Sequence, residues 1–181
     1  MTAVVFLADG FEECEALIVV DILRRAGIET VMASVMGQLD VDSSRHITVR
    51  ADRLAEEADY SGADIIILPG GKRGTENLAA SELVRSQCLA FAAEKRLAAI
   101  CAAPSLLASL GILEGKEATC HPDFALQMKG AVLTGGSVAV SGNITTGQGL
   151  GAAFPFAFEL VRQLAGEDKV RQIKEAICYR E

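Results

Sequence analysis

The sequence is poor in basic side chains and contains no long apolar run. Its 17 Lys and Arg residues stand against 24 Asp and Glu, so the formal net charge is −7 at pH 7. An acidic chain with no run of basic residues argues against nucleic acid as the main partner and against anionic membranes. No run approaches the length of a membrane-spanning helix, and residues 3–8 are too short and lack the basic flank of a signal peptide. We therefore expect a cytoplasmic protein.

The cysteines show no paired spacing. The chain has five of them, an odd number, and no Cys-x-x-Cys pair. This pattern fits neither a disulfide framework nor the ligand spacing of a structural zinc site, so we expect reduced thiols and no bound metal. Cys88 and Cys178 fall in predicted helices and are expected in the core. Cys14 is also expected to be packed, with a second oxidisable thiol as the alternative.

Strand and helix patterns alternate along the whole chain. The 181 residues are half hydrophobic, which suits one domain with a sizeable core. Buried strands followed by helical patterns predict one α/β domain over residues 1–181, with a mainly parallel sheet and helices on both faces. The expected strands are 4–7, 28–35, 64–68 and 97–101, with weaker ones at 118–120, 131–133, 138–140 and 144–146.

The predicted helices follow from apolar residues spaced i, i+3, i+4 and i+7. The first includes residues 16–23 and closes at Gly27, whose conformational freedom suits a helix C-cap. The other expected segments are helices at about 76–94, 105–110 and 154–177, an edge hairpin or small excursion at 37–52, and a hairpin turn at 142–143.

Cys101 stands where a buried strand breaks into a helix. Parallel sheets bind ligands beyond the carboxyl ends of their strands, so the loops 9–15, 69–74 and 101–104 are expected to face one crevice. The unpaired amides and positive dipole end of the next helix favour the thiolate, which is the nucleophilic and oxidisable form of cysteine. The alternative is a small buried hydrophobic residue.

Glu15 is a candidate partner for this thiol. The neighbouring Glu12 and Glu13 are explained by their favourable interaction with the helix dipole. An ionised Glu15 beside a thiolate would repel it, whereas a protonated carboxyl would donate a hydrogen bond to the sulfur. We therefore expect Glu15 to have a raised pKa.

His121 is the candidate base or orienting group, because a nucleophilic cysteine needs one nearby and the chain has only two histidines. It could equally be a loop imidazole that caps a backbone group. The backbone amides of Gly70 and Gly71, with those of Cys101 and Ala102, could hold an oxyanion. The alternative for the two glycines is a turn that needs positive φ.

The glycine-rich segment 147–152 lies between a strand and a helix. Its spacing is G-x-G-x-G rather than G-x-G-x-x-G, and a complete βαβ unit does not fit in the remaining residues. We therefore do not expect a dinucleotide site there, and the sequence has no phosphate-binding P-loop.

Four segments together resemble the ThiJ/PfpI superfamily. Within it they resemble the DJ-1 branch, which includes the parkinsonism-linked protein deglycase and its bacterial homologues. The resemblance covers nearly the whole chain, in order and at similar spacing. The segments are 3–16, 64–71, 99–104 and 121–122.

The resemblance implies a flavodoxin-like α/β sandwich, a homodimer and a site that needs no cofactor. It implies that Cys101 is the nucleophile and redox cysteine, on a strained elbow between strand and helix. The remaining site residues that it implies are Glu15 as the protonated carboxyl partner, His121 as the nearby histidine, Gly70 and Gly71 under the oxyanion site, and Arg45 near the dimer interface and the pocket.

The chain departs from its relatives at three positions. Ala102 stands where the protease-like and chaperone-like branches resemble Ile-Cys-His-Gly, so the His that follows their cysteine is absent and peptidase activity is disfavoured. Ala103 stands where many members carry Gly. Gln148 replaces an Arg of some members, which removes one cationic contact to an anionic ligand.

The function implied is that of a glutathione-independent glyoxalase or deglycase. Such a hydrolase-type enzyme converts methylglyoxal to lactate or repairs a glycated group, with a small dicarbonyl or glycated molecule as substrate. The alternative is an oxidative-stress redox sensor or holdase that acts through oxidation of Cys101. A thiazole-monophosphate role has no support, since no phosphate cradle is evident.

Overall fold

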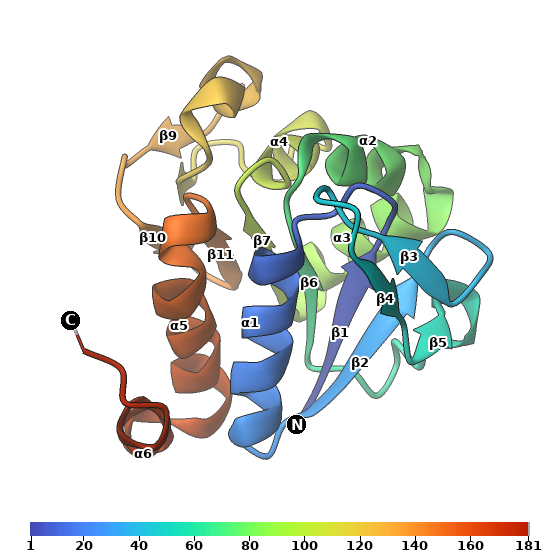
Figure 1. Cartoon of the computed structure of the whole chain (residues 1–181). Helices are drawn as coiled ribbons and strands as arrows, with labels where there is room; N and C mark the ends of the chain where they lie inside the picture. Colours follow the sequence, from blue (N-terminus) through green and yellow to red (C-terminus); the bar gives the residue numbers. More distant parts are fainter. Residues whose placement is uncertain (181) are drawn as a thin grey trace.

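The centre of the molecule is a seven-stranded sheet with strand order β10-β11-β7-β6-β1-β2-β5. Neighbouring strands are parallel except for β10, which runs antiparallel to β11. The structure, a computed structural model, describes residues 1–180 (Figure 1). The strands are β1 (Thr2–Leu7), β2 (Glu29–Ser34), β5 (Arg53–Leu54), β6 (Ile65–Leu68), β7 (Arg96–Ile100), β10 (Val138–Ser141) and β11 (Ile144–Gly147).

Helices cover both faces of this sheet, as the alternating pattern predicts. Successive side chains of a strand point to opposite faces, so Val5 and Leu7 of β1 enter one core while Val4 and Phe6 enter the other. Helices lie on both sides of the sheet (Figure 1). Their buried apolar residues close the two cores. The first is covered by α1 (Glu13–Arg25), α5 (Ala153–Ala165) and α6 (Glu167–Ala176), the second by α2 (Lys72–Ala80), α3 (Glu82–Glu94) and α4 (Pro104–Ser109).

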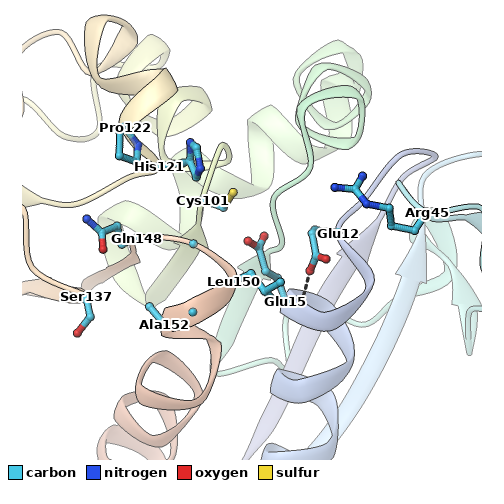
Figure 2. Close-up of a pocket in the computed structure, with 12 residues that line it drawn as sticks. Glu12, Glu15, Arg45, Cys101, His121, Pro122, Ser137, Gln148, Leu150 and Ala152 are labelled. Carbon is cyan, nitrogen blue, oxygen red and sulfur yellow. Dashed lines mark hydrogen bonds between the residues drawn. The ribbon is translucent and has the colours of Figure 1, made fainter.

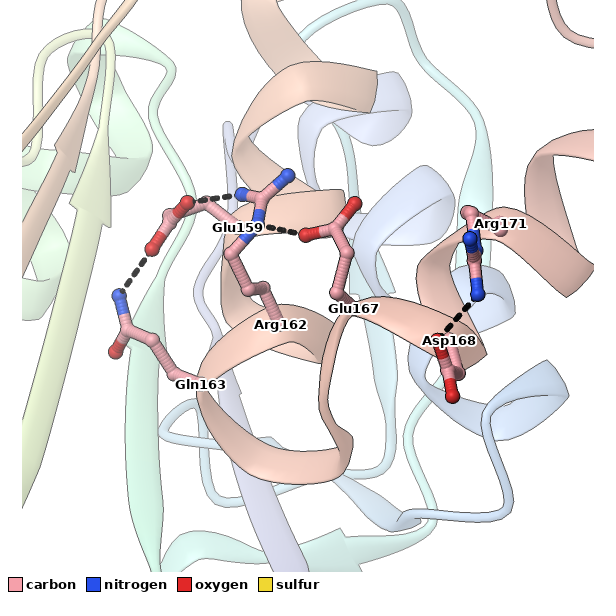
Figure 3. A network of polar contacts seen from close by, with 6 residues as sticks. All are labelled: Glu159, Arg162, Gln163, Glu167, Asp168 and Arg171. Atoms are coloured by element: carbon pink, nitrogen blue, oxygen red, sulfur yellow. Dashed lines mark hydrogen bonds and ion pairs between the residues drawn. The ribbon is translucent and has the colours of Figure 1, made fainter.

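Two of the predicted helical segments are divided in the structure. The segment expected from residue 76 begins at Lys72, and Ser81 separates α2 from α3 by capping Val84 N–H with its hydroxyl. The segment 154–177 is divided at Gly166, whose φ of 86° ends α5 and starts α6. Arg162 spans this joint by pairing with Glu159 and Glu167 (Figure 3).

The smaller elements agree with the expected turns and excursions. Residues 37–52 contain an antiparallel hairpin, and Gly142 occupies the turn between β10 and β11 with a φ of 63°. The elements outside the main sheet are β3 (Asp40–Asp42), β4 (Thr48–Arg50), β8 (Glu117–Ala118), β9 (Val132–Leu133) and the 3₁₀ turns η1 (Ala55–Glu57), η2 (Pro122–Gln127) and η3 (Leu150–Ala152).

All five cysteines are free thiols. Cys88 is buried, as predicted, but Cys14 and Cys178 are exposed and those two predictions are wrong. The first turn of α1 buries Glu13 and Glu15 instead, which turns Cys14 outward. Cys178 lies beyond the end of α6 in a left-handed conformation (φ 56°).

Neither a bilayer-spanning helix nor a metal cluster occurs among residues 1–180. None of the described helices has the length and apolar character needed to cross a bilayer. No group of three or more His, Cys, Asp or Glu side chains in this part of the chain is placed to hold a metal ion.

Candidate active site

Cys101 lies on a sharp elbow between β7 and α4. Its φ of 66° is left-handed, a conformation that costs a residue with a Cβ about 1–2 kcal/mol. Two backbone hydrogen bonds hold it: its N–H donates to the Gly147 carbonyl (2.9 Å), and its carbonyl accepts from His121 N–H (2.9 Å). The elbow presents the partly exposed thiol to a cavity of about 670 Å³ (Figure 2).

Glu15 reaches the thiol from the first turn of α1. The residue is only 1% exposed, and its Oε2 accepts a hydrogen bond from Gly70 N–H at 2.9 Å. The Glu12 carboxylate caps the helix by accepting from Glu15 N–H at 2.7 Å, which fixes this turn. Burial raises the pKa of Glu15 to about 7, against the lowering effects of hydrogen bonds from Cys101 and Gly70. The raised pKa expected from the sequence is therefore present.

Glu15 and Cys101 behave as a coupled pair. With Glu15 ionised, burial and then the Glu15 charge raise the pKa of Cys101 to about 12, while the amides of Gly71 and Ala102 act to lower it. While Glu15 is ionised, Cys101 is therefore a neutral thiol, contrary to the thiolate expected from the sequence. With the proton on Glu15, the charge is gone and the O–H donates to the sulfur, so the effect of Glu15 changes sign. The thiolate therefore exists at neutral pH only while Glu15 keeps the proton of the pair.

Gly70 and Gly71 allow the backbone to approach the thiol closely. A Cβ on Gly70 would lie 2.5 Å from Cys101 Cβ and 2.5 Å from Glu15 Oε2. Gly71 has a φ of 89°, and a Cβ there would lie 2.3 Å from the Gly10 carbonyl oxygen. Neither position has room for a Cβ atom, so both must be glycine. The positive φ of Gly71 favours glycine there as well.

The amides near the sulfur divide into two groups. Those of Gly70 and Cys101 are already engaged, by the Glu15 carboxyl and by a carbonyl of β11. Those of Gly71 and Ala102 act on the Cys101 sulfur. Of the four amides expected at an oxyanion site, these two are directed at the reacting atom.

His121 lines the same cavity as Cys101 and caps a backbone group, as one of its two interpretations expected. Its role as a base or orienting group for the thiol stays a prediction. Its Nδ1 accepts from Asp123 N–H at 3.3 Å and caps η2, and its side chain is 43% exposed. Because Nδ1 is an acceptor there, the neutral ring carries its proton on Nε2. That nitrogen is the one available to donate to a bound carbonyl.

Arg45 lies on the opposite side of the cavity from His121 (Figure 2). Its Nη1 donates to the Ser44 carbonyl at 3.3 Å, and its charge helps to lower the pKa of Glu13. The structure thus brings together every site residue that the sequence indicated: the lining contains Glu15, Arg45, Cys101 and His121, with Gly70, Gly71 and Ala102 against the thiol.

A fourth loop, which the sequence analysis set aside, forms another wall of the cavity. Residues 148–152 follow β11, which is paired in parallel with β7, so this loop leaves the same edge of the sheet as the Cys101 elbow. Gln148 and Ser137 add polar groups to this wall. The sequence feature that could have predicted this wall is the position of a glycine-rich loop directly after a strand, whether or not the loop matches a nucleotide-binding motif.

Comparison with known proteins agrees with this site. The family model described as the DJ-1/PfpI family matches residues 1–163. The chain belongs to the DJ-1/PfpI family. The Drosophila melanogaster protein dj-1beta is 35% identical over 97% of this chain and 96% of its own length. The solved structure of oxidized Toxoplasma gondii DJ-1 has a TM-score of 0.95 and 34% identity, and the match covers 99% of both chains.

Membership of the DJ-1/PfpI family confirms the resemblance and the flavodoxin-like sandwich. A further protein to which the chain is similar is the Caenorhabditis elegans glutathione-independent glyoxalase DJR-1.2, which is 29% identical over 92% of this chain and 90% of its own length. In this DJ-1/PfpI chain, the cavity beside Cys101 is formed by loops that follow β1, β6, β7 and β11.

We expect Gly70→Ala to disrupt the site. The new methyl group would overlap Cys101 Cβ and Glu15 Oε2, so the elbow or the carboxyl must move. Overpacking of this kind costs about 1–3 kcal/mol of unfolding free energy, measurable by urea denaturation. Gly151→Ala is the matched control, because it lines the same cavity and a Cβ there meets nothing within 4 Å. Equal stability of the two variants would contradict the close packing described here.

Proposed function

We propose that this protein is a cofactor-free thiol enzyme that acts on reactive dicarbonyls or the groups they modify. The observation that carries the proposal is the pairing of a partly exposed thiol on a strained elbow with a buried carboxyl whose pKa is about 7. A group with that pKa can both release and accept a proton near neutral pH. The similarity to a protein named as a glutathione-independent glyoxalase supports this choice of substrate.

The proposed reaction is an internal redox step that needs no outside oxidant. The Cys101 sulfur attacks the aldehyde carbon of methylglyoxal, so an S–C bond forms, the C=O π bond breaks and the oxygen takes a proton. A base then removes the proton on that carbon and returns it to the neighbouring ketone carbon through an enediol. The first carbon becomes a thioester while the second becomes an alcohol, and water releases lactate and the thiol.

The site residues fit the steps of this reaction. Glu15 is placed to hold the proton that moves between the two carbons, since it lies against the sulfur. His121 lines the cavity, so its Nε2 can donate to the developing oxyanion, and the amides of Gly71 and Ala102 lie against the sulfur that adds to the carbonyl carbon. For a glycated group, the same attack on an aminocarbinol carbon would release the amine, and we include this deglycase reaction in the proposal.

The test is conversion of methylglyoxal by the purified protein without glutathione. Proton NMR should show lactate forming at a rate proportional to protein concentration. In deuterated water, any proton that exchanges on the base should appear as deuterium at the second carbon of lactate. Absence of lactate above the rate in buffer alone would reject the proposal.

The second candidate is a redox sensor that acts through the same cysteine. The partly exposed sulfur, the nearby carboxyl O–H and the likeness to the oxidized form of a DJ-1 protein favour oxidation of Cys101 to a stabilised sulfinate.

We predict that mild peroxide oxidises Cys101 before the other four cysteines. Tryptic mass spectrometry over a peroxide series should show Cys101 sulfinate while Cys14 and Cys178 remain thiols, although both are exposed. If these two exposed cysteines oxidise first, the sensor function is excluded, whereas the enzymatic proposal is unaffected.

Two further proposals remain, one from the family resemblance and one from the sequence. We propose that the protein is a homodimer, which sedimentation tests by giving twice the 19.1 kDa mass of one chain. A cytoplasmic location also stays a prediction, and fractionation of the producing cells tests it.

A further inference from the structure

A second cavity of about 320 Å³ adjoins the Cys101 cavity, and Arg45 lines both. We call it the basic pocket, because Arg45, His46, Lys72 and Arg73 line it. In the sequence these residues form two separate pairs, so no basic cluster is visible there. The fold brings the pairs together at the edge of the sheet where the thiol lies.

Backbone contacts fix the frame of the basic pocket. Gly10 N–H donates to the Asp42 carbonyl (2.7 Å), and Ser44 N–H donates to the Phe11 carbonyl (2.7 Å), which ties the β3–β4 hairpin to the loop after β1. Gly10 has a φ of 84°, and a Cβ there would lie 2.6 Å from Arg73 Cβ, so the start of α2 packs directly on the same loop. The basic side chains therefore project from two segments, the β3–β4 hairpin and the start of α2, which the loop after β1 holds together.

The charge in the basic pocket is positive and not neutralised by ion pairs. Three permanent cations, Arg45, Lys72 and Arg73, face the two carboxylates Asp9 and Asp42. The carboxylates are engaged locally: Asp9 Oδ1 accepts from Asp42 N–H at 3.1 Å, and Asp42 Oδ1 accepts from a threonine hydroxyl at 2.6 Å. Within residues 1–180, neither Lys72 nor Arg73 forms an ion pair.

This local charge is unusual for the chain, whose net charge is −7. Five arginines elsewhere in the described residues are paired with carboxylates: Arg24, Arg25, Arg50, Arg162 and Arg171. The basic pocket also contains the first residues of α2, where the helix dipole is positive. An anion with several acceptor oxygens would complete this arrangement.

The basic pocket and the thiol lie close enough to bind one small molecule. Gly70 contacts Cys101, and Lys72 follows only two residues later, a separation of at most about 7 Å along the backbone. The Arg45 side chain lies at the rim of the thiol cavity (Figure 2).

We propose that the basic pocket binds the phosphate monoester of a substrate whose aldehyde reaches Cys101. The aldehyde part of this inference rests on the proposed function. A phosphate monoester fits better than a carboxylate, because its double charge and three terminal oxygens match two guanidinium groups, an ammonium and a helix N-terminus.

The test compares glyceraldehyde 3-phosphate with glyceraldehyde as protectants of Cys101 against iodoacetamide. Each aldehyde forms a reversible hemithioacetal: the sulfur adds to the carbonyl carbon and the oxygen takes the proton. Alkylation is followed by mass spectrometry, so the readout does not require turnover. We expect the phosphorylated aldehyde to protect at a concentration at least 10-fold lower.

Charge variants identify where the phosphate binds. The 10-fold advantage should disappear in Lys72→Gln/Arg73→Gln and persist in Lys129→Gln/Arg180→Gln, which removes two exposed cations outside both cavities. Inorganic phosphate should also abolish the advantage in the unmodified protein if free phosphate occupies the same place.

Each contrary outcome points to a different failure. Equal protection by the two aldehydes, or an advantage that survives in Lys72→Gln/Arg73→Gln, would overturn the phosphate site. If neither aldehyde protects Cys101, no substrate binds with its phosphate in the basic pocket and its aldehyde at the sulfur, and the inference fails. If lactate formation is absent as well, the proposed function is also rejected. If lactate forms but the two aldehydes protect equally, the proposed enzymatic function stands and only the phosphate site is rejected.

Discussion

Replacement of Cys101 by Ala should lower kcat/KM for methylglyoxal by at least ~1,000-fold, because the sulfur forms the bond on which every later step depends. The fold should be kept. The elbow is held by backbone hydrogen bonds that Cys101 donates to Gly147 and accepts from His121, and neither involves the side chain. Ala meets the same left-handed φ as Cys. Lactate formation measured by NMR, with circular dichroism of the same samples, gives both quantities.

The matched controls are Cys14→Ala and Cys178→Ala. Both residues are exposed free thiols and neither lines the Cys101 cavity, so their loss should leave kcat/KM within about twofold. Turnover by Cys101→Ala at the rate of these controls would exclude a covalent mechanism at this thiol.

Replacement of Glu15 by Gln should reduce kcat by ~100-fold or more, because the proton that moves between the substrate carbons loses its carrier. Gln keeps the size of the side chain and can still accept from Gly70 N–H through its carbonyl. A steric role alone would therefore leave activity largely intact. Asp21→Asn is the control, since that exposed carboxylate also belongs to α1 and lines neither cavity.

The same substitution should change how stability depends on pH. The native pKa of Glu15 is about 7 against an ordinary value of 4.5, so between these pH values the native pair keeps a proton that the unfolded chain has lost. The unfolding free energy therefore falls as pH rises from 4.5 to 7, by about 3 kcal/mol at about 1.4 kcal/mol for each pH unit. The unfolding free energy falls with rising pH whether the proton that remains on the native pair is held by Glu15 or by Cys101.

Urea denaturation at pH 4.5 and pH 7 measures this contribution as the difference between the unmodified protein and Glu15→Gln. We expect Glu15→Gln to lack the decrease and Cys101→Ala to keep it, because burial is the largest cause of the raised pKa. The same pH dependence in all three proteins would show that Glu15 titrates normally in the native state.

The order of elements was predictable because each strand and helix carries its own periodic signal. The β-branched residues Ile65 and Ile67 are buried in one core and Ile66 in the other, as a central parallel strand requires. The start of α2 was missed because its first turn, Lys72-Arg73-Gly74-Thr75, is polar and contains glycine. A left-handed Gly71 sets that start, which is a backbone property rather than a pattern of apolar residues.

The site was predictable only to the extent that loops at one sheet edge must meet. That rule placed Glu15, Gly70 and Cys101 together. It could not assign which amides were already engaged, because the Gly70 N–H bond to Glu15 depends on side-chain geometry across 55 residues of sequence. The basic pocket was missed for the same reason, since two dipeptides far apart in the chain form it.

The central claim, a Cys101 thiolate that receives a hydrogen bond from protonated Glu15, is tested most directly by titrating the thiolate through its ultraviolet absorbance. Cys101→Ser provides the blank, and Glu15→Leu removes both the charge and the O–H group. We predict a Cys101 pKa below the ordinary value of about 8.5 that rises in Glu15→Leu. A pKa above the ordinary value that falls in Glu15→Leu would show that Glu15 is ionised beside a neutral thiol, and would contradict the account.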